Sequence, residues 1–339
     1  MGLIHPRDYD AWAAWERSHH RLRLAKSAVL SRVRREEPPP FVVTSRVDEP
    51  RVLAALDVAR GTSVDALLAP LGHIEDAAIL SRGVLPHALV PDGWASRALS
   101  SLEELPRSVK VVLSAGSFPQ TSLPAHDWAA RHSARFVVVQ HGLLTPFAPP
   151  LPRDALLLAW SDKDAVFWSE GRSDVETAVV GSRLLWTAAQ SSPTELATGR
   201  PVFLGQLHGT ELPRRQLVAL TAGFCRDHDA VYRPHPGEKD IVSRLVHRWW
   251  RSHGIRIDDG DTQLRLLTSP VVSVFSTGLL EAAAQGRPAW GYHPNPPAWL
   301  SEFWGRYAIT QWGDQPTKNP VARGSGDPAR SIAKVVARL

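Results

Sequence analysis

The sequence has little cysteine, little lysine and no long apolar run, and each shortage excludes a class of protein. A single cysteine, Cys225, among 339 residues excludes a disulfide framework and a cysteine-based zinc site. No apolar segment approaches the roughly 20 residues that a transmembrane helix needs, and the N-terminus lacks the apolar stretch of a secretory signal. We therefore expect a cytoplasmic protein in which Cys225, after an apolar helical run, is a buried structural residue.

Because lysine is scarce, nearly all of the positive charge is carried by arginine. The net charge is +5 and the isoelectric point is about 9.6. Arginine pairs well with phosphate and carboxylate groups, so this excess suits an anionic substrate or a membrane surface. No stripe of aromatic and basic residues and no common nucleic-acid-binding motif occurs, so nucleic acid is not an expected partner. No spacing of His, Asp and Glu resembles a metal site, so no metal is expected.

Residues 8–36 have the pattern of a basic amphipathic helix, which the prolines at 38–40 end. Two interpretations stay open. The helix packs on the N-terminal domain, or it lies on an anionic membrane surface and places the protein peripherally at the inner membrane face.

Beyond this segment, short apolar runs alternate with helical stretches. In the first half, strands are predicted at 41–44, 64–68, 87–90, 109–113, 135–140, 155–160 and 176–180, and helices at 49–60, 74–82, 94–104, 123–133 and 162–169. Repeated strand–helix units with continuously apolar strands predict a parallel sheet that is covered on both faces.

A polar break at 190–194 and 198–201 predicts an interdomain linker, after which the pattern restarts. Strands are predicted at 202–204, 229–233, 255–257, 271–274 and 288–292, and helices at 211–226, 237–253, 262–268, 277–286, 297–305 and 327–338. The expected fold class is therefore α/β, with two Rossmann-like domains facing a cleft. The N-terminal domain is expected over 1–190, with its leading helix, and the C-terminal domain over 198–339. Ligands of such sheets bind beyond the carboxyl ends of the strands.

Three predicted strand ends carry motifs. Gln140-His141-Gly142 follows the fifth strand, where Gly142 allows a sharp turn and His141 is a candidate general base for an attacking hydroxyl. The structural alternative is a loop histidine bonded to backbone.

The second motif is Arg233-Pro234-His235-Pro236, at the end of a strand and before a predicted helix. Prolines on both sides fix the backbone of His235. The N–H groups of the helix N-terminus, together with Arg233 and His235, are expected to bind phosphate. The alternative is a rigid turn with an exposed histidine.

In the third motif, Ser276-Thr277-Gly278 begins a helix directly after a strand. Its hydroxyls and amides form a candidate phosphate cradle, although Ser276 and Thr277 as simple helix caps is the alternative. Glu281, one turn further, is a candidate for ribose hydroxyls. His208 and Gly209, in the loop after the first strand of the second domain, are candidates for the donor diphosphate.

In this order, the His-Gly, Arg-x-His-Pro and Ser-Thr motifs resemble those of bacterial glycosyltransferases of the GT-B fold. Among these, the chain resembles CDP-glycerol glycerophosphotransferases of teichoic acid synthesis, and then capsule- and sialyl-type transferases with a His-Pro motif. The resemblance implies that His141 is the base, that Arg233 and His235 contact the donor phosphate, and that Ser276 and Thr277 form a second phosphate-binding motif.

The resulting hypothesis is metal-independent transfer of a glycosyl or polyol-phosphate group in cell-surface polysaccharide or glycoconjugate synthesis. The donor would be CMP-, CDP- or UDP-linked, and the acceptor a hydroxyl of a sugar, a polymer or a lipid-linked molecule; no further cofactor is expected. Two alternatives stay open. One is a nucleotide-sugar epimerase of the same architecture, and the other is a non-catalytic carbohydrate-binding module that uses some of the 13 tryptophans.

Overall fold

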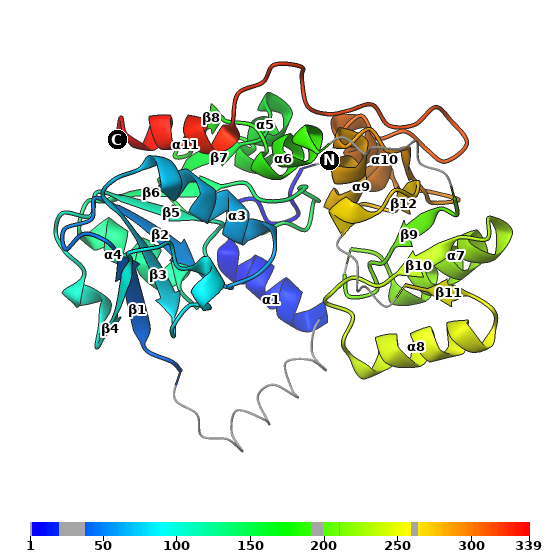
Figure 1. Cartoon of the computed structure of the whole chain (residues 1–339), viewed down its shortest axis with the longest axis horizontal. Helices are drawn as coiled ribbons and strands as arrows, with labels where there is room; N and C mark the ends of the chain where they lie inside the picture. The colour runs from blue at the N-terminus through cyan, green and yellow to red at the C-terminus, as the bar shows by residue number, and fades with distance from the viewer. Residues whose placement is uncertain (1, 20–37, 119, 192–198, 210, 259–263) are drawn as a thin grey trace. The chain divides into compact units, whose positions relative to one another are not determined.

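The structure is a computed structural model that describes residues 2–19, 38–118, 120–191, 199–209, 211–258 and 264–339. The chain divides into two compact units (Figure 1). The first comprises Gly2–Leu184 and Gly326–Leu339, and the second comprises Leu185–Ser325. The C-terminal residues 326–339 thus belong to the first unit, whereas the sequence had assigned all of 198–339 to the second domain.

An eight-stranded sheet, in the order β4-β1-β3-β2-β5-β6-β7-β8, forms the centre of the first unit. Its strands are β1 (Phe41–Ser45), β2 (Val52–Leu56), β3 (Ala77–Arg82), β4 (Ala95–Leu99), β5 (Val111–Ser114), β6 (Arg135–Val139), β7 (Leu156–Ala159) and β8 (Glu176–Val179). The helices are α1 (Tyr9–His19), α3 (Thr62–Leu68), α4 (Ser122–Arg131), α5 (Asp162–Ser169), α6 (Arg183–Gln190, which crosses into the second unit) and α11 (Pro328–Val336), with short 3-10 turns at Ala69–His73, His87–Leu89 and Leu102–Glu104.

Both faces of this sheet are buried under helices. Along β2, Leu53 and Ala55 face a core that includes α4 and α5, while Val52, Ala54 and Leu56 face a core that includes α3 and α11. Side chains alternate between the faces of a strand, so a strand covered on both sides is apolar throughout. The predicted doubly covered sheet is confirmed.

Two predictions for the first unit are wrong. First, the sheet is not wholly parallel, because β1 pairs antiparallel with both β3 and β4. Second, helix and strand are interchanged over 49–104. Strands β2, β3 and β4 lie within the predicted helices at 49–60, 74–82 and 94–104, while the α-helix α3 and a 3-10 turn occupy the predicted strands at 64–68 and 87–90. Alanine and leucine favour helices intrinsically, but burial on both faces made the Ala- and Leu-rich segment 52–56 a central strand.

The second unit has five parallel strands in the order β11-β10-β9-β12-β13. They are β9 (Val202–Leu204), β10 (Val231–Arg233), β11 (Arg256–Ile257), β12 (Val271–Ser273) and β13 (Ala289–Gly291). Its helices are α7 (Arg214–Asp227), α8 (Ile241–Ser252), α9 (Thr277–Ala284) and α10 (Ala298–Arg306), with a 3-10 turn at Leu264–Leu266. The first strand lies centrally and the order reverses between β9 and β12, as in a Rossmann sheet. All five predicted strands are confirmed.

Helices cover both faces of this second sheet. Phe203 of β9 contacts Phe224 of α7, and Tyr232 of β10 contacts Trp250 of α8. Leu204, the next residue along β9, instead lies against Gly278 of α9. Consecutive strand residues point to opposite faces, so α7 and α8 pack on one face and α9 on the other.

The N-terminal segment is helical over Tyr9–His19, and the rest of the predicted 8–36 helix lies outside the described residues. Trp12 donates its indole N–H to the Phe147 carbonyl at 2.9 Å, and Trp15 stacks on the Phe147 ring. These contacts favour packing on the first unit for this part of the segment. None of the described helices combines the length and the apolarity that crossing a bilayer requires.

Candidate functional site

Three loops of the second unit leave the same edge of its sheet. They follow β9 (residues 205–209), β10 (residues 234–237) and β12 (residues 274–276). Because these strands are parallel, the loops meet at one edge, and the gap between β9 and β12 is the topological switch point of the sheet. Six predicted residues lie in these loops or at the start of α9: His208, Gly209, His235, Ser276, Thr277 and Gly278.

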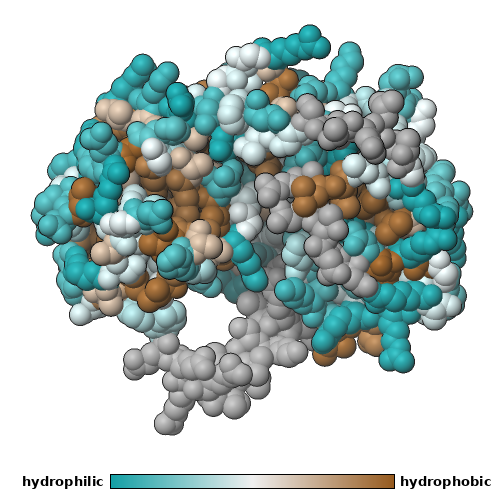
Figure 2. Space-filling view, viewed as in Figure 1, coloured by the Kyte–Doolittle hydropathy of each residue, from teal (hydrophilic) through white to brown (hydrophobic). Residues whose placement is uncertain are grey.

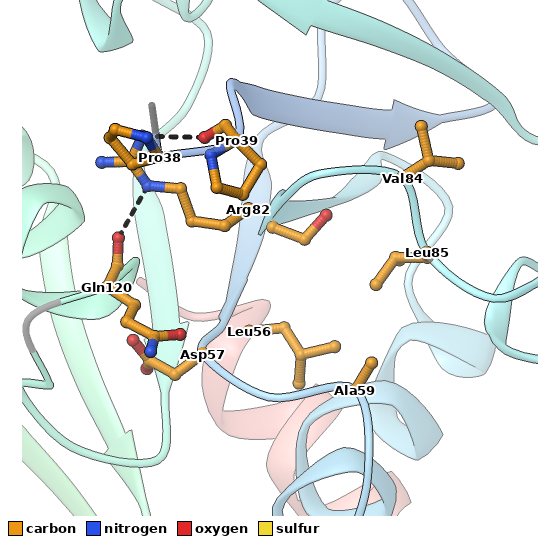
Figure 3. Close-up of a pocket in the computed structure, with 10 residues that line it drawn as sticks. Pro38, Pro39, Leu56, Asp57, Ala59, Arg82, Val84, Leu85 and Gln120 are labelled. Atoms are coloured by element: carbon orange, nitrogen blue, oxygen red, sulfur yellow. Dashed lines mark hydrogen bonds between the residues drawn. The ribbon is translucent and has the colours of Figure 1, made fainter. Parts of the chain in front are cut away.

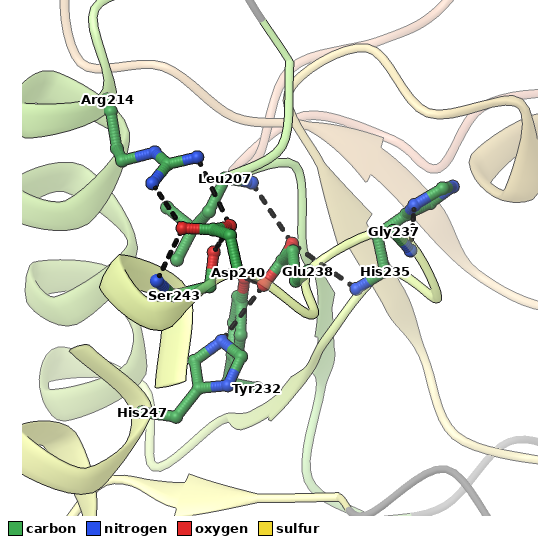
Figure 4. Close-up of polar contacts among 9 residues, drawn as sticks. All are labelled: Leu207, Arg214, Tyr232, His235, Gly237, Glu238, Asp240, Ser243 and His247. Atoms are coloured by element: carbon green, nitrogen blue, oxygen red, sulfur yellow. Dashed lines mark hydrogen bonds and ion pairs between the residues drawn. The ribbon is translucent and has the colours of Figure 1, made fainter. Parts of the chain in front are cut away.

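The buried carboxylate of Glu238 ties the first two loops together (Figure 4). It accepts hydrogen bonds from the backbone N–H of Leu207 at 3.0 Å and of His235 at 3.2 Å. It also accepts from the Tyr232 hydroxyl at 2.7 Å and contacts His247 Nε2 at 2.9 Å. One acidic residue therefore links the loops after β9 and β10.

Burial by itself would raise the pKa of Glu238. The hydrogen bonds from its four neighbours outweigh burial and hold the pKa of this carboxyl below its ordinary value, so it is ionised at neutral pH. Sequence reasoning assigned no role to Glu238, because nothing in the local pattern distinguishes a buried acid from an exposed one. The only signal was its position immediately after the His-Pro-Gly turn.

Gln206 makes the corresponding link between the loops after β9 and β12. Its Oε1 accepts a hydrogen bond from Phe275 N at 2.9 Å and from the Ser273 hydroxyl at 3.2 Å. Ser273 Oγ in turn accepts from Ser276 N at 3.1 Å. The two strands on either side of the switch point are thus joined by side chains as well as by their backbones.

The imidazoles of His208 and His235 stack at this edge, with ring centroids 3.8 Å apart. His235 Nδ1 accepts a hydrogen bond from Gly237 N at 3.0 Å, so the ring proton of the neutral form lies on Nε2. Burial lowers the pKa of His235, against an opposing effect of Glu238, and keeps the ring neutral. Nε2–H is therefore a donor suited to a phosphate oxygen.

The N-terminus of α9 faces the same edge. Ser276 caps it, its hydroxyl accepting from Gly278 N at 3.2 Å, so the capping interpretation of Ser276 is correct. A Cβ at Gly278 would lie 2.6 Å from Leu264 Cδ2 and 2.9 Å from Leu204 Cδ1, so a side chain there would force these leucines to shift. Thr277 is the first helical residue, and Glu281 lies one turn further into α9.

Arg233 lies on the α9 face of the sheet, because it pairs in register with Leu204 of β9. Its guanidinium forms an ion pair with Asp258, which follows β11. The predicted phosphate contact of Arg233 therefore faces competition from a carboxylate already in place.

The predicted anion site at the start of the next helix is wrong. α8 begins at Ile241 rather than at 237, and Asp240 caps it by accepting from Ser243 N at 3.1 Å. Asp240 also forms an ion pair with Arg214 at 2.9 Å. A carboxylate therefore occupies the N-terminus of α8, whereas the N-terminus of α9 is capped by the neutral Ser276 hydroxyl.

His141 lies in the first unit, directly after β6 and Gln140. Gln140 fixes this turn, since its side chain accepts from Trp160 N at 2.8 Å and donates to the Gly142 carbonyl at 3.0 Å. Burial lowers the pKa of His141, with a weaker opposing interaction from the Val139 backbone. A neutral imidazole is the form that accepts a proton.

A cavity of about 520 Å³ opens at the carboxyl ends of β2 and β3 in the same unit (Figure 3). Asp57, Arg82 and Gln120 are among its polar residues, while Leu56, Val84 and Leu85 are among its apolar ones. The Asp57 carboxylate accepts from Thr121 N at 2.8 Å and Ser122 N at 3.1 Å, so it caps α4 from the loop that follows β2. Sequence reasoning missed this cavity because it read the β2 and β3 segments as helices. His141 is not among the residues that line it.

Among the described residues, no three His, Cys, Asp or Glu side chains gather as a metal site would require. Cys225 is buried, and burial raises the pKa of its thiol to about 12. A thiol with so high a pKa is unreactive at neutral pH, in agreement with the structural role expected for it.

No protein-family model matches the chain, and no curated protein matches it in sequence. Among solved structures, the S. aureus MnaA–UDP complex is similar over 84% of this chain and 87% of that chain, at 12% identity and a TM-score of 0.49. UDP-GlcNAc 2-epimerase from Methanocaldococcus jannaschii is similar over 85% of this chain and 98% of that chain, at 12% identity and a TM-score of 0.46. Anabaena Alr3699/HepE in complex with UDP is similar over 85% of this chain and 96% of that chain, at 12% identity and a TM-score of 0.40. Likenesses this low assign neither a ligand nor a reaction to this chain.

Proposed function

We propose that this chain transfers a glycosyl or polyol-phosphate group from a nucleotide-activated donor to a hydroxyl acceptor. The observation that carries the proposal is the meeting of three loops at the switch point of the second sheet, beside the N-terminus of α9. Parallel sheets bind nucleotides at this position because loop amides and a helix N-terminus there favour phosphate.

The donor diphosphate lies, in this proposal, against the N-terminus of α9 and the stacked histidines. His235 donates from Nε2, and Thr277 offers its hydroxyl and amide. The Arg233 guanidinium gives up its ion pair with Asp258 and binds a phosphate oxygen instead. His208 and Gly209 contact the same diphosphate, and Glu281 accepts from ribose hydroxyls. Fixed donors around the leaving phosphate stabilise the charge that develops on it, without a metal ion.

The acceptor is assigned to the first unit. Its cavity beside Asp57 and Arg82 has the size of a small-molecule site and combines apolar walls with a few polar groups. In the sheet order, β5 alone separates β2 from β6, so the carboxyl ends of β2 and β6 lie roughly 10 Å apart. His141 takes the proton of the attacking hydroxyl, and the bond to the leaving nucleotide phosphate breaks as the new bond forms.

The finer assignment is to the chemistry of CDP-glycerol glycerophosphotransferases or of capsule- and sialyl-type transferases, in cell-surface polysaccharide synthesis. Its support is the order of the His-Gly, Arg-x-His-Pro and Ser-Thr motifs along the chain. The donor is then linked to CMP, CDP or UDP.

The test is titration calorimetry of the full chain with CMP, CDP, UDP and GDP. We expect at least one of the cytidine or uridine nucleotides to bind, and binding to weaken at least tenfold in His235→Ala but not in His73→Ala, whose histidine is exposed in the first unit. Binding of none of the four nucleotides would overturn the proposal.

A second assay distinguishes the proposed transferase from an epimerase. Incubation with a nucleotide sugar in the absence of any acceptor leaves the sugar unchanged if the chain is a transferase. Conversion to an isomer under these conditions would favour the epimerase. Nucleotide binding with turnover that survives His141→Ala would show that His141 is not the base.

A further inference from the structure

We propose that α8 of the second unit docks on an anionic lipid bilayer. This helix presents an unusual surface, because it exposes large apolar side chains as well as charged ones. The apolar stripe of α8 consists of Ile241 (55% exposed), Val242 (48%), Leu245 (60%) and Trp249 (47%). The proposal stands apart from the nucleotide site and does not depend on the reaction.

The spacing along the helix puts this stripe on one side. Ile241, Leu245 and Trp249 are four residues apart, so at 3.6 residues per turn they lie one above the other. The side that faces the sheet is a different one, because Ser243, His247 and Trp250 are the buried residues. The helix therefore uses one apolar face to join the fold and leaves a second uncovered.

Arginines border the uncovered stripe. Arg244 and Arg248 are exposed one turn apart, each next in sequence to a residue of the stripe, and Arg251 follows. The helix itself contains no acidic residue. In the part of the chain that the structure describes, neither Arg244 nor Arg248 takes part in an ion pair. Figure 2 shows apolar and hydrophilic residues side by side where Figure 1 places α8.

The arginines beside this apolar stripe indicate which partner binds it. A helix with Leu and Trp on one side and arginines beside them lies in the headgroup region of a membrane, where the apolar side chains reach the acyl boundary and the cations meet lipid phosphate. A second copy of the chain fits less well. A two-fold pairing of α8 with itself would bring the arginines of both copies together.

The first experiment is co-sedimentation of the full chain with vesicles of phosphatidylcholine alone or with about 30% of the anionic lipid phosphatidylglycerol added. We expect binding to the anionic vesicles only. Leu245→Ser with Trp249→Ser, or Arg244→Gln with Arg248→Gln, should weaken it at least about fivefold. Matched controls are Val166→Ser on α5, where Val166 is 73% exposed, and Arg215→Gln with Arg226→Gln on α7.

A second experiment locates the contact. Cys225 is buried and is the only cysteine, so Leu245→Cys can be labelled selectively with an environment-sensitive fluorophore. Its emission should shift to the blue on anionic vesicles, while the same label at Val166→Cys should not respond. Unchanged binding in both α8 variants, or no shift at position 245, overturns the proposal and moves any membrane contact elsewhere, for instance to the basic segment 20–36. Self-association that Leu245→Ser abolishes would identify the stripe as a chain–chain interface and also overturn it.

Discussion

The imidazole rings of His208 and His235 lie face to face, with 11° between their planes and 3.8 Å between their centroids. They come from loops that follow two neighbouring parallel strands, and Gly237 lies close to both. A Cβ at Gly237 would be 3.1 Å from His235 Nδ1 and 3.3 Å from the His208 ring, so the stack and the turn depend on each other. This stack and the hydrogen bonds of Glu238 both link the two loops at the proposed phosphate site.

The stack predicts coupled effects on nucleotide binding. Because each ring positions the other, His208→Ala and His235→Ala should each weaken binding about tenfold, and the double variant should lose less than the product of the two. Titration calorimetry of the four proteins gives the coupling. Strictly multiplicative losses would show that the rings act separately.

Glu238→Gln should destabilise the second unit by ~1–3 kcal/mol, because an amide cannot accept all the hydrogen bonds that the buried carboxylate accepts. Tyr232→Phe removes one donor and should cost less, ~0.5–1.5 kcal/mol. Urea unfolding measures both. If Glu238→Gln is as stable as the wild type, the carboxylate does not hold the loops.

Two glycine substitutions should move stability in opposite directions. Gly278→Ala places a methyl group against Leu264 and Leu204 and should cost ~1–3 kcal/mol. Gly223 lies within α7 with open space around its Cβ position, so Gly223→Ala should stabilise by ~0.5–1 kcal/mol. Calorimetric unfolding compares the pair. Nucleotide affinity should fall in Gly278→Ala only.

Stability should decrease as the pH falls below 6.5. Burial lowers the pKa of His141, His235 and His293 in the folded chain from their ordinary value of 6.5. The unfolded chain then binds more protons below this pH, so the free energy of unfolding falls as the pH falls through 6.5. Thermal melts between pH 8 and 5 should show the slope, and His141→Gln with His235→Gln should flatten it. A slope of the opposite sign would contradict the buried, neutral assignment.

Asp57→Ala should cost ~0.5–2 kcal/mol of stability, because α4 loses the carboxylate that accepts from its first N–H groups. Nucleotide affinity should be unchanged, since the proposed nucleotide site lies in the other unit. Asp92→Ala, at an exposed position in the same unit, is the control for lost charge. Calorimetry and the binding titration together decide the matter; an equal effect of both variants would exclude the capping role.

The sequence by itself determined the second unit well. Its strands include short β-branched or aromatic runs such as 202–204 and 271–273, each followed by a turn and a helix, so local pattern and final structure agree there. It also placed His208, His235 and Ser276 at strand ends. Only tertiary structure showed that those ends belong to neighbouring strands, because the order β11-β10-β9-β12-β13 depends on contacts between distant segments.

In the first unit, tertiary contacts overrode local preference. Val52–Leu56 is a strand because sheet neighbours and helices bury it on both faces, although its alanines and leucines favour a helix when taken alone. Glu238, Asp57 and the α8 stripe were likewise decided by packing. Whether an acid is buried among donors, or a leucine is left exposed, depends on which distant residues cover it, and no local spacing encodes that.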